Sequence, residues 1–297
     1  MPILDHILDF IINKLSSIRT KKTSKTPSFF SPEQLQLFDK KGTYLHKVNR
    51  KTNLYLHNDS VLSKAIMDGF EENELNFLHK YIKEDDIFMD IGANIGLFSV
   101  TASEKITSGQ IFAFEPSPKT FERLMGNIRL NNSQENIHPQ NIALSDKPDT
   151  LDFYLSLDGF DAWNGFTLPQ VGSYFQRIKV KTITLDQFFT ENKLNKINLI
   201  KIDVEGWEYP VLKGSTEIIK KFSPDFLIEF TEENARTSGF QCIMIFDLLL
   251  NLGYQWYEID LDLSYNQATR KEYFEYCNLL ATKNIDLVKA RTVDWKK

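Results

Sequence analysis

The chain has 297 residues, and its 42% hydrophobic content is enough to bury a substantial core as one α/β domain. Its 40 acidic residues outnumber its 35 basic residues, and the formal charge of -5 argues against nucleic acid as a partner. Cys242 and Cys277 are too few for a disulfide framework or a thiolate metal site and are typical of a reducing compartment, so we expect a cytoplasmic protein.

Residues 1–32 predict an N-terminal extension made of a helix and a linker. Isoleucine and leucine side chains between Ile3 and Ile18 share one side of a helical wheel, but charged residues interrupt the run. Neither a transmembrane segment nor a secretory signal is therefore expected. We expect the helix to pack on the domain, to mediate oligomerisation or to touch a membrane surface, and residues 20–32 are typical of a flexible linker.

Residues 33–85 predict a hairpin and a helix at the start of the folded domain. The segments Tyr44–Val48 and Leu54–His57 flank a polar turn and have the pattern of two paired strands. Leu75, Leu78 and Ile82 have helical spacing, which predicts a helix from Glu72 to Ile82.

Residues 86–297 predict a Rossmann-like α/β domain. Five short apolar runs have the composition of parallel strands that are buried on both faces. These runs are Ile87–Asp90, Ile111–Glu115, Ile137–Asn141, Leu199–Asp203 and Phe226–Phe230. Helical patterns separate most of them, and Ser117 and Pro118 are typical of the N-cap and first residue of the helix that follows the second run.

A long insertion interrupts the alternation between the third and fourth strands. Leu151–Leu155 and Arg177–Thr182 have strand patterns, and they enclose a loop that is too long to be a mere connection. Trp163 lies in this polar loop beside Asn164 and Gly165 rather than on an apolar stripe. Trp163 and Asn164 are therefore candidate substrate contacts.

The end of the chain predicts one further helix and two further strands. The helix near Phe240–Leu252 ends at Gly253, a residue that commonly terminates helices. Tyr254–Ile259 and Tyr276–Ala281 follow as strands that are expected to form a closing antiparallel pair.

The strongest functional signal is the run Asp90-Ile-Gly92-Ala93-Asn94-Ile-Gly96, where a predicted strand gives way to a helix. Its glycines allow a tight turn and close approach of a ligand to the backbone, and the helix offers free N–H groups. Glu115 ends the next strand, where a carboxylate can accept hydrogen bonds from both hydroxyls of a ribose. The pattern indicates a nucleoside-bearing ligand.

The residue at position 94 favours a methyl donor over a dinucleotide. A dinucleotide site requires a glycine there so that a pyrophosphate can reach the backbone, and this chain has Asn94. Asp90 would repel a diphosphate but favours the cationic methionine end of S-adenosylmethionine. A nicotinamide-dependent reductase and a non-catalytic protein that binds the methyl donor remain as alternatives.

A second motif makes the resemblance specific. The run Leu199-Ile-Lys-Ile-Asp203-Val-Glu205-Gly206-Trp-Glu208 resembles the hallmark of the FkbM-type methyltransferases. Phe114-Glu115-Pro116, Asn141–Asp146 and Ile228-Glu229 match the order and spacing of that family, and the resemblance covers roughly residues 55–285.

The resemblance implies a class I methyltransferase that transfers a methyl group to oxygen, often on a sugar, a glycan or a secondary metabolite. It implies a mostly parallel seven-stranded sheet with an antiparallel last strand and helices on both faces. The residues that it assigns to the donor are Asp90, Gly92, Ala93, Asn94 and Gly96 for the methionine end, Glu115 and Pro116 for the ribose, Ala143 and Leu144 for the adenine, and Asp203 beside the methyl group.

Three acids are candidates for the transfer step. Asp203 and Glu229 end strands that we expect to be neighbours, so their strand ends should lie roughly 5 Å apart. Two such carboxylates either raise the pKa of one, which becomes a general base, or hold a divalent cation such as Mg²⁺ that acidifies the acceptor hydroxyl. Glu205 is the expected third ligand or an alternative base.

Overall fold

The computed structural model describes residues 29–293. The expected N-terminal helix and most of the expected linker lie outside these residues. The last linker positions already belong to the packed domain, because Phe30 is buried and its ring meets that of Phe38 edge to face. No helix within residues 29–293 is long and apolar enough to cross a membrane.

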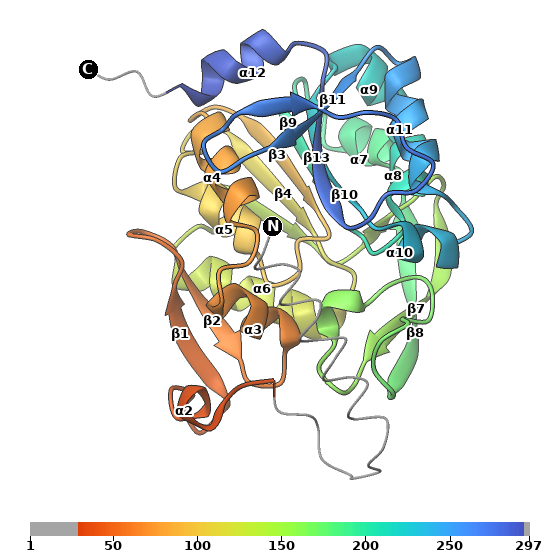
Figure 1. The fold of residues 1–297 in the computed structure, drawn as a ribbon. Helices are drawn as coiled ribbons and strands as arrows, with labels where there is room; N and C mark the ends of the chain where they lie inside the picture. Colours follow the sequence, from red (N-terminus) through yellow and green to blue (C-terminus); the bar gives the residue numbers. More distant parts are fainter. Residues whose placement is uncertain (1–28, 294–297) are drawn as a thin grey trace.

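An eight-stranded sheet forms the centre of the molecule (Figure 1). Its strands in spatial order are β12 (Tyr265–Gln267), β11 (Gln255–Ile259), β13 (Cys277–Thr282), β10 (Asp225–Phe230), β9 (Leu199–Ile202), β3 (Ile87–Ile91), β4 (Gln110–Phe114) and β5 (Ile137–Gln140). The five strands from β10 to β5 are parallel, and β13 is antiparallel to both of its neighbours. This arrangement confirms the expected class I methyltransferase sheet with its antiparallel last strand.

The short strand β12 adds an eighth strand to the seven that were expected. It pairs with β11 through three residues after a tight turn in which the Asp260 amide donates to the carbonyl of Ser264. The Ser264 hydroxyl also donates to Asp260 Oδ2 at 2.9 Å. The turn is made by local polar contacts, and the three-residue edge strand is too short to show a periodic pattern.

Helices cover both faces of the sheet, as expected (Figure 1). One face packs on α7 (Leu185–Glu191), α8 (Glu208–Lys213), α9 (Thr216–Phe222), α10 (Glu232–Thr237) and α11 (Cys242–Asn251). The other packs on α3 (Val61–Met67), α4 (Glu72–Tyr81), α5 (Leu97–Ser103), α6 (Pro118–Leu130) and α12 (Ile285–Thr292). The central strands contribute side chains to both cores, which explains why they are apolar at nearly every position.

Two smaller β elements complete the fold at the end of the molecule away from α12 (Figure 1). The expected hairpin is present as β1 (Thr43–Lys47) and β2 (Asn53–His57), preceded by the short helix α2 (Pro32–Leu35). The insertion forms a three-stranded sheet of β6 (Ala143–Leu144), β8 (Phe175–Ile183) and β7 (Asp149–Ser156), with the 3₁₀ turn η1 (Asp161–Trp163) between β7 and β8. Both elements approach the carboxyl edge of the large sheet, where α3 contacts η1.

Replacement of Gly126 by alanine is expected to stabilise the domain. Gly126 lies inside α6, and a Cβ atom built on it has no neighbour within 4 Å. Glycine in a helix interior costs about 0.5–1 kcal/mol relative to alanine, so the free energy of unfolding should rise by that amount. Denaturant unfolding of the two proteins measures this difference, and a less stable Gly126→Ala variant would show that α6 is not packed as described.

Candidate active site

A pocket opens at the carboxyl edge of the large sheet, where the chain order reverses between β3 and β9. In open α/β sheets, ligands bind at this position because the loops of the two halves separate there. The pocket has an empty volume of about 970 Å³, including its mouth. Its lining includes Asp90, Gly92, Ala93, Asn94, Glu115, Pro116, Ala143, Leu144, Asn164, Asp203, Glu205 and Glu229. The structure therefore brings together nearly all of the residues that the sequence singled out.

The glycine loop after β3 has the tight turns that its sequence predicts. Gly92 and Gly96 have φ angles of 86° and 92°, and Asn94 between them has a φ of 46°. A Cβ atom on Gly92 would lie 1.7 Å from the carbonyl oxygen of Asp203, so the close approach of the β3 and β9 loops requires a glycine there. Gly96 is not part of the lining, because it forms the N-cap of α5.

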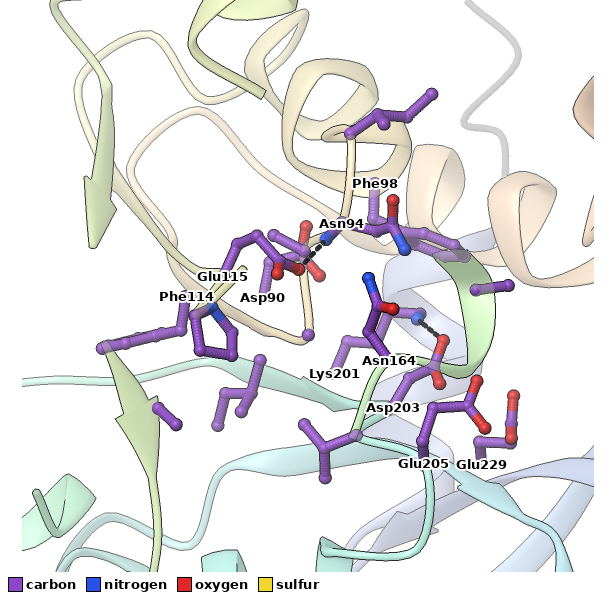
Figure 2. A pocket seen from close by; sticks show the side chains of 18 of the residues that line it. Asp90, Asn94, Phe98, Phe114, Glu115, Asn164, Lys201, Asp203, Glu205 and Glu229 are labelled. Carbon is purple, nitrogen blue, oxygen red and sulfur yellow. Dashed lines mark hydrogen bonds and ion pairs between the residues drawn. The ribbon is translucent and has the colours of Figure 1, made fainter. Parts of the chain in front are cut away.

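Glu115 holds the glycine loop after β3 in place. Its carboxylate accepts hydrogen bonds from the backbone amides of Ser117 at 2.8 Å and Asn94 at 3.1 Å, and the second of these is drawn in Figure 2. Burial raises the pKa of Glu115 to about 8, against the opposing effect of the two amide donors. The side chain thus links the glycine loop to the start of α6 and presents its carboxyl group to the pocket.

Two acceptor atoms in the same part of the pocket lack donors. Asp90 accepts from the Ser99 hydroxyl through Oδ2 at 2.5 Å, but its Oδ1 is buried without a hydrogen-bond partner in the described part of the chain. The Oδ1 atom of Asn94 is buried and unpartnered as well. Buried acceptors without donors are costly, so this end of the pocket fits a ligand that carries N–H or O–H groups. The ammonium and ribose hydroxyl groups of S-adenosylmethionine meet this requirement.

The inserted turn η1 closes the pocket from the other side. Asp161 is buried, and its Oδ1 accepts from the Ser60 hydroxyl at 2.9 Å while its Oδ2 lies 3.3 Å from Arg123 Nη1. Burial raises the pKa of Asp161 to about 6. These contacts tie the turn to the start of α3 and to α6, and they bring Asn164 into the lining.

Trp163 does not line the pocket, and its expected contact with the substrate stays a prediction. Its ring packs against that of Phe160 with centroids 6.0 Å apart. Phe160 in turn meets Phe29 edge to face. The polar composition of the loop suggested exposure, but these aromatic contacts give the Trp163 side chain a packing role.

A group of charged residues occupies the far end of the pocket. Figure 2 shows Asp90, Asn94 and Glu115 on one side and Asp203, Glu205 and Glu229 on the other, with Lys201 and Asn164 between them. β9 and β10 are neighbours in parallel register, as expected, and place Asp203 beside Glu229. Oxygen atoms of these two carboxylates approach within 4.8 Å of one another.

Lys201 supplies a buried positive charge to this group. Its ammonium lies 2.7 Å from Asp203 Oδ2 and 4.4 Å from the centroid of the Phe98 ring. Burial lowers the pKa of Lys201, but the negative charges of Asp203, Glu71 and Asp90 raise it by more, so the side chain stays cationic. Burial and the charge of Asp203 raise the pKa values of Glu205 and Glu229 well above the usual range.

Trp207 and Glu208, the last two residues of the second motif, have structural contacts. Trp207 packs on Phe166 with ring centroids 4.7 Å apart. Glu208 is buried rather than a surface helix charge, and its Oε1 accepts from the backbone amides of Val204 and Gly206, both at 3.1 Å. The Glu208 side chain therefore fixes the turn that contains Glu205.

Three residues of the pocket were missed in the sequence: Lys201, Glu71 and Asp161. Lys201 could have been found, because residues two apart on a strand point to the same side and Asp203 follows it by two. Asp161 is part of the long loop of the insertion, but its partners Ser60 and Arg123 are distant in sequence. Glu71 precedes α4 and has no local motif, so its place in the pocket depends on tertiary packing alone.

Comparisons with known proteins agree on one class of enzyme. A family model described as a methyltransferase FkbM domain matches residues 90–256, a segment shorter at both ends than the 55–285 expected from the motifs. Hexuronic acid methyltransferase AglP of Haloferax volcanii is 33% identical over 53% of this chain and 61% of its own length. 2-O-methyltransferase NoeI of Sinorhizobium fredii is 29% identical over 47% of this chain and 61% of its own length.

The chain thus spans less than two thirds of the length of each of these two relatives. Among solved structures, methyltransferase FkbM from Methylobacillus flagellatus matches with a TM-score of 0.45 and 14% identity, over 69% of this chain and 47% of that chain.

Proposed function

Since the chain belongs to the family defined by the methyltransferase FkbM domain, we propose that it transfers a methyl group from S-adenosylmethionine to a hydroxyl oxygen of a sugar, a glycan or a secondary metabolite. The family membership confirms the resemblance expected from the two sequence motifs. The observation that carries the proposal is the pair of unpartnered acceptors, Asp90 Oδ1 and Asn94 Oδ1, beside the Glu115 carboxyl group.

The donor half of the pocket consists of residues from β3, β4 and β6. Asp90 and Asn94 accept hydrogen bonds from the methionine end of the donor, and Glu115 accepts from its ribose hydroxyls. Ala143 and Leu144 provide an apolar surface for the adenine, and Pro116 lies beside them in the lining. Gly92, Ala93 and Gly96 shape the loop so that the donor can approach the backbone. When bound there, S-adenosylmethionine supplies an electrophilic methyl group.

The acceptor half is formed by the charged residues at the ends of β9 and β10. We assign the handling of the acceptor hydroxyl to Asp203, Glu205 and Glu229, because they line the pocket on the side away from Asp90 and Glu115. As the new bond to the acceptor oxygen forms, the electron pair of the broken bond stays on sulfur and the hydroxyl proton passes to this carboxylate group. Lys201 pairs with Asp203, and Asn164 can hydrogen-bond the acceptor.

A sugar acceptor is suggested by two features. AglP is by its name a hexuronic acid methyltransferase and NoeI a 2-O-methyltransferase. The acceptor half of this pocket offers carboxylate and amide groups, which can hydrogen-bond the hydroxyls of a sugar. Incubation with S-adenosylmethionine labelled in its methyl group and a panel of hexuronic acids and neutral glycosides tests the proposal. Label on a sugar oxygen supports it, whereas label on nitrogen or carbon of an acceptor would contradict it.

Donor affinity is expected to increase with pH because Glu115 ionises. Burial raises the pKa of Glu115 to about 8, so its carboxyl group is mostly protonated below that value and mostly ionised above it. The two ribose hydroxyls of the donor molecule donate hydrogen bonds, and the ionised Glu115 carboxylate can accept from both. The donor molecule should therefore bind more tightly above the pKa of Glu115 than below it. We expect S-adenosylhomocysteine to bind roughly tenfold more tightly at pH 9 than at pH 7.

Calorimetry on the wild-type protein and on Glu115→Gln measures this dependence. The amide of the variant does not titrate, so any pH dependence that remains in it belongs to the ligand and can be subtracted. If the affinity for S-adenosylhomocysteine changed with pH equally in the two proteins, Glu115 would not contact the ribose.

A further inference from the structure

Three carboxyl groups from separate segments converge in the acceptor half of the pocket. Oxygen atoms of Glu71, Asp203 and Glu229 all lie within 4.8 Å of one another. Asp203 follows β9 and Glu229 lies near the end of β10, whereas Glu71 comes from the turn between α3 and α4. This turn precedes residues 90–256, so the family match does not include the third carboxylate.

One carboxylate oxygen of Glu71 is left without a donor in this cluster. The residue is 5% exposed, and its Oε1 atom is buried and has no hydrogen-bond donor among residues 29–293. In the same cluster, Glu229 accepts from the Thr231 hydroxyl at 2.9 Å and Asp203 pairs with Lys201 at 2.7 Å. Glu71 is thus the member of the cluster whose buried Oε1 atom is not satisfied by any donor of the described residues.

The charge balance of the cluster calls for another cation. The Lys201 ammonium can neutralise one of the three carboxylates, and within residues 29–293 no ion pair joins another lysine or arginine to Glu71 or Glu229. An uncompensated buried carboxylate costs several kcal/mol or more, so clusters of this kind are paired, protonated or bound to a metal.

The Tyr276 hydroxyl lies near this cluster, because burial and, after it, the charges of Glu229, Glu71 and Asp203 raise the pKa of Tyr276 well above its usual value. Phe230 pairs with Cys277 and Glu229 with Asn278 in the antiparallel ladder of β10 and β13, so Tyr276 points to the same side of the sheet as Glu229. Its hydroxyl oxygen is buried, and no hydrogen-bond partner for it is present between residues 29 and 293. The site therefore offers oxygen atoms of the kind that hard divalent cations prefer.

We propose that Glu71, Asp203 and Glu229 bind a divalent cation in the acceptor half of the pocket. Two ligands of one ion can lie no further apart than twice the metal–oxygen distance. That limit is about 4.6–5.2 Å for Ca²⁺ and about 4.2 Å for Mg²⁺. The observed spread of up to 4.8 Å fits an ion of the size of Ca²⁺ directly, and Mg²⁺ fits after the side chains draw together.

This assignment rests on the proposed function and makes it more specific. A cation at this position orients the acceptor and makes its hydroxyl more acidic. Glu205 is outside the cluster of three, and its Oε2 accepts from Asn234 at 2.6 Å. Glu205 is then the carboxylate that receives the hydroxyl proton, rather than the third metal ligand that the sequence suggested.

Direct binding of the ion to the full chain tests the site. After removal of metals with a chelator, Ca²⁺, Mg²⁺ and Mn²⁺ are titrated by calorimetry, and bound Mn²⁺ is followed by electron paramagnetic resonance. We expect one site in the wild-type protein and an affinity lower by about tenfold or more in Glu71→Gln, since the loss of a ligand should cost at least as much as the loss of an outer partner.

Glu72→Gln is the matched control, because Glu72 is the adjacent glutamate and is exposed. It should bind the ion as the wild type does. Glu229→Gln is measured in parallel, so that a failure of Glu71→Gln to fold still leaves one ligand tested. No binding of any of the three ions at millimolar concentration, or equal affinity in Glu71→Gln, Glu229→Gln and Glu72→Gln, would overturn the site.

A second readout separates this inference from the proposed function. S-adenosylhomocysteine should bind to Glu71→Gln as it does to the wild type, because Glu71 lies in the acceptor half. If the protein bound S-adenosylhomocysteine but no cation, the cation site would be refuted and the proposed methyl transfer would be unaffected. Binding of the cation without any affinity for the nucleoside would refute the proposed function instead.

Discussion

Replacement of Asp203 by asparagine is expected to reduce turnover by about a hundred- to ten-thousand-fold, the range for loss of acid–base catalysis, because Asp203 belongs to the carboxylate group and the proposed cation site that act on the acceptor hydroxyl. Asp203 adjoins Glu229 at the ends of neighbouring strands and pairs with Lys201. The amide keeps the shape of the side chain but removes the charge that faces the acceptor hydroxyl. Donor affinity should change no more than a few-fold, because Asp90 and Glu115 are untouched.

The measurement is turnover with the acceptor that the wild-type protein methylates, together with donor binding by calorimetry. Asp152→Asn is the matched control, since Asp152 lies on the small sheet and pairs with Lys179 at 2.9 Å outside the pocket. Unfolding curves show whether loss of the partner of Lys201 has destabilised the protein. Full turnover in Asp203→Asn, Glu205→Gln and Glu229→Gln would refute the assignment of the catalytic group.

Replacement of Glu115 by alanine is expected to weaken donor binding on the order of a hundredfold. Two hydrogen bonds from ribose hydroxyls to a carboxylate contribute about 1.5–3 kcal/mol each, and water replaces part of this when the side chain is removed. The variant also loses the acceptor for the amides of Asn94 and Ser117, so the glycine loop becomes less well held. Both effects act on the donor half of the pocket.

Glu115→Gln should give an intermediate loss, because the amide keeps one acceptor oxygen but loses the negative charge. Glu122→Ala on the exposed side of α6 removes the same side chain outside the pocket and should leave affinity unchanged. Wild-type affinity in Glu115→Ala would remove the ribose assignment while leaving the rest of the pocket as described.

The strands and the donor half could be predicted from the sequence because their causes are local. A strand buried on both faces is apolar along its length, and a loop that needs positive φ angles shows glycines, as at Gly92 and Gly96. The N-cap at Ser117 followed by Pro118 likewise marks the start of α6. These signals give the order of the elements, and the order places the carboxyl ends of β3, β4 and β9 at one edge.

The acceptor half could be predicted only in part because distant segments complete it. Asp203 and Glu229 follow from strand order, but Glu71 reaches them from the turn before α4. Asp161 is held by Ser60 and Arg123, and no spacing in the sequence relates these three residues. The packing of Trp163 could not be predicted for the same reason, since its neighbour Phe160 in turn contacts Phe29 from a distant part of the chain.

Calorimetry with the wild-type chain tests the central claim most directly, with S-adenosylmethionine, S-adenosylhomocysteine and NADH as separate ligands. The geometry of the donor half predicts that the first two bind at one site per chain and that NADH does not, because Asn94 stands where a pyrophosphate would need a glycine and Asp90 would repel it. Binding of NADH in preference to S-adenosylmethionine, or no binding of S-adenosylmethionine or its product, would contradict the assignment of this pocket as a methyl-donor site.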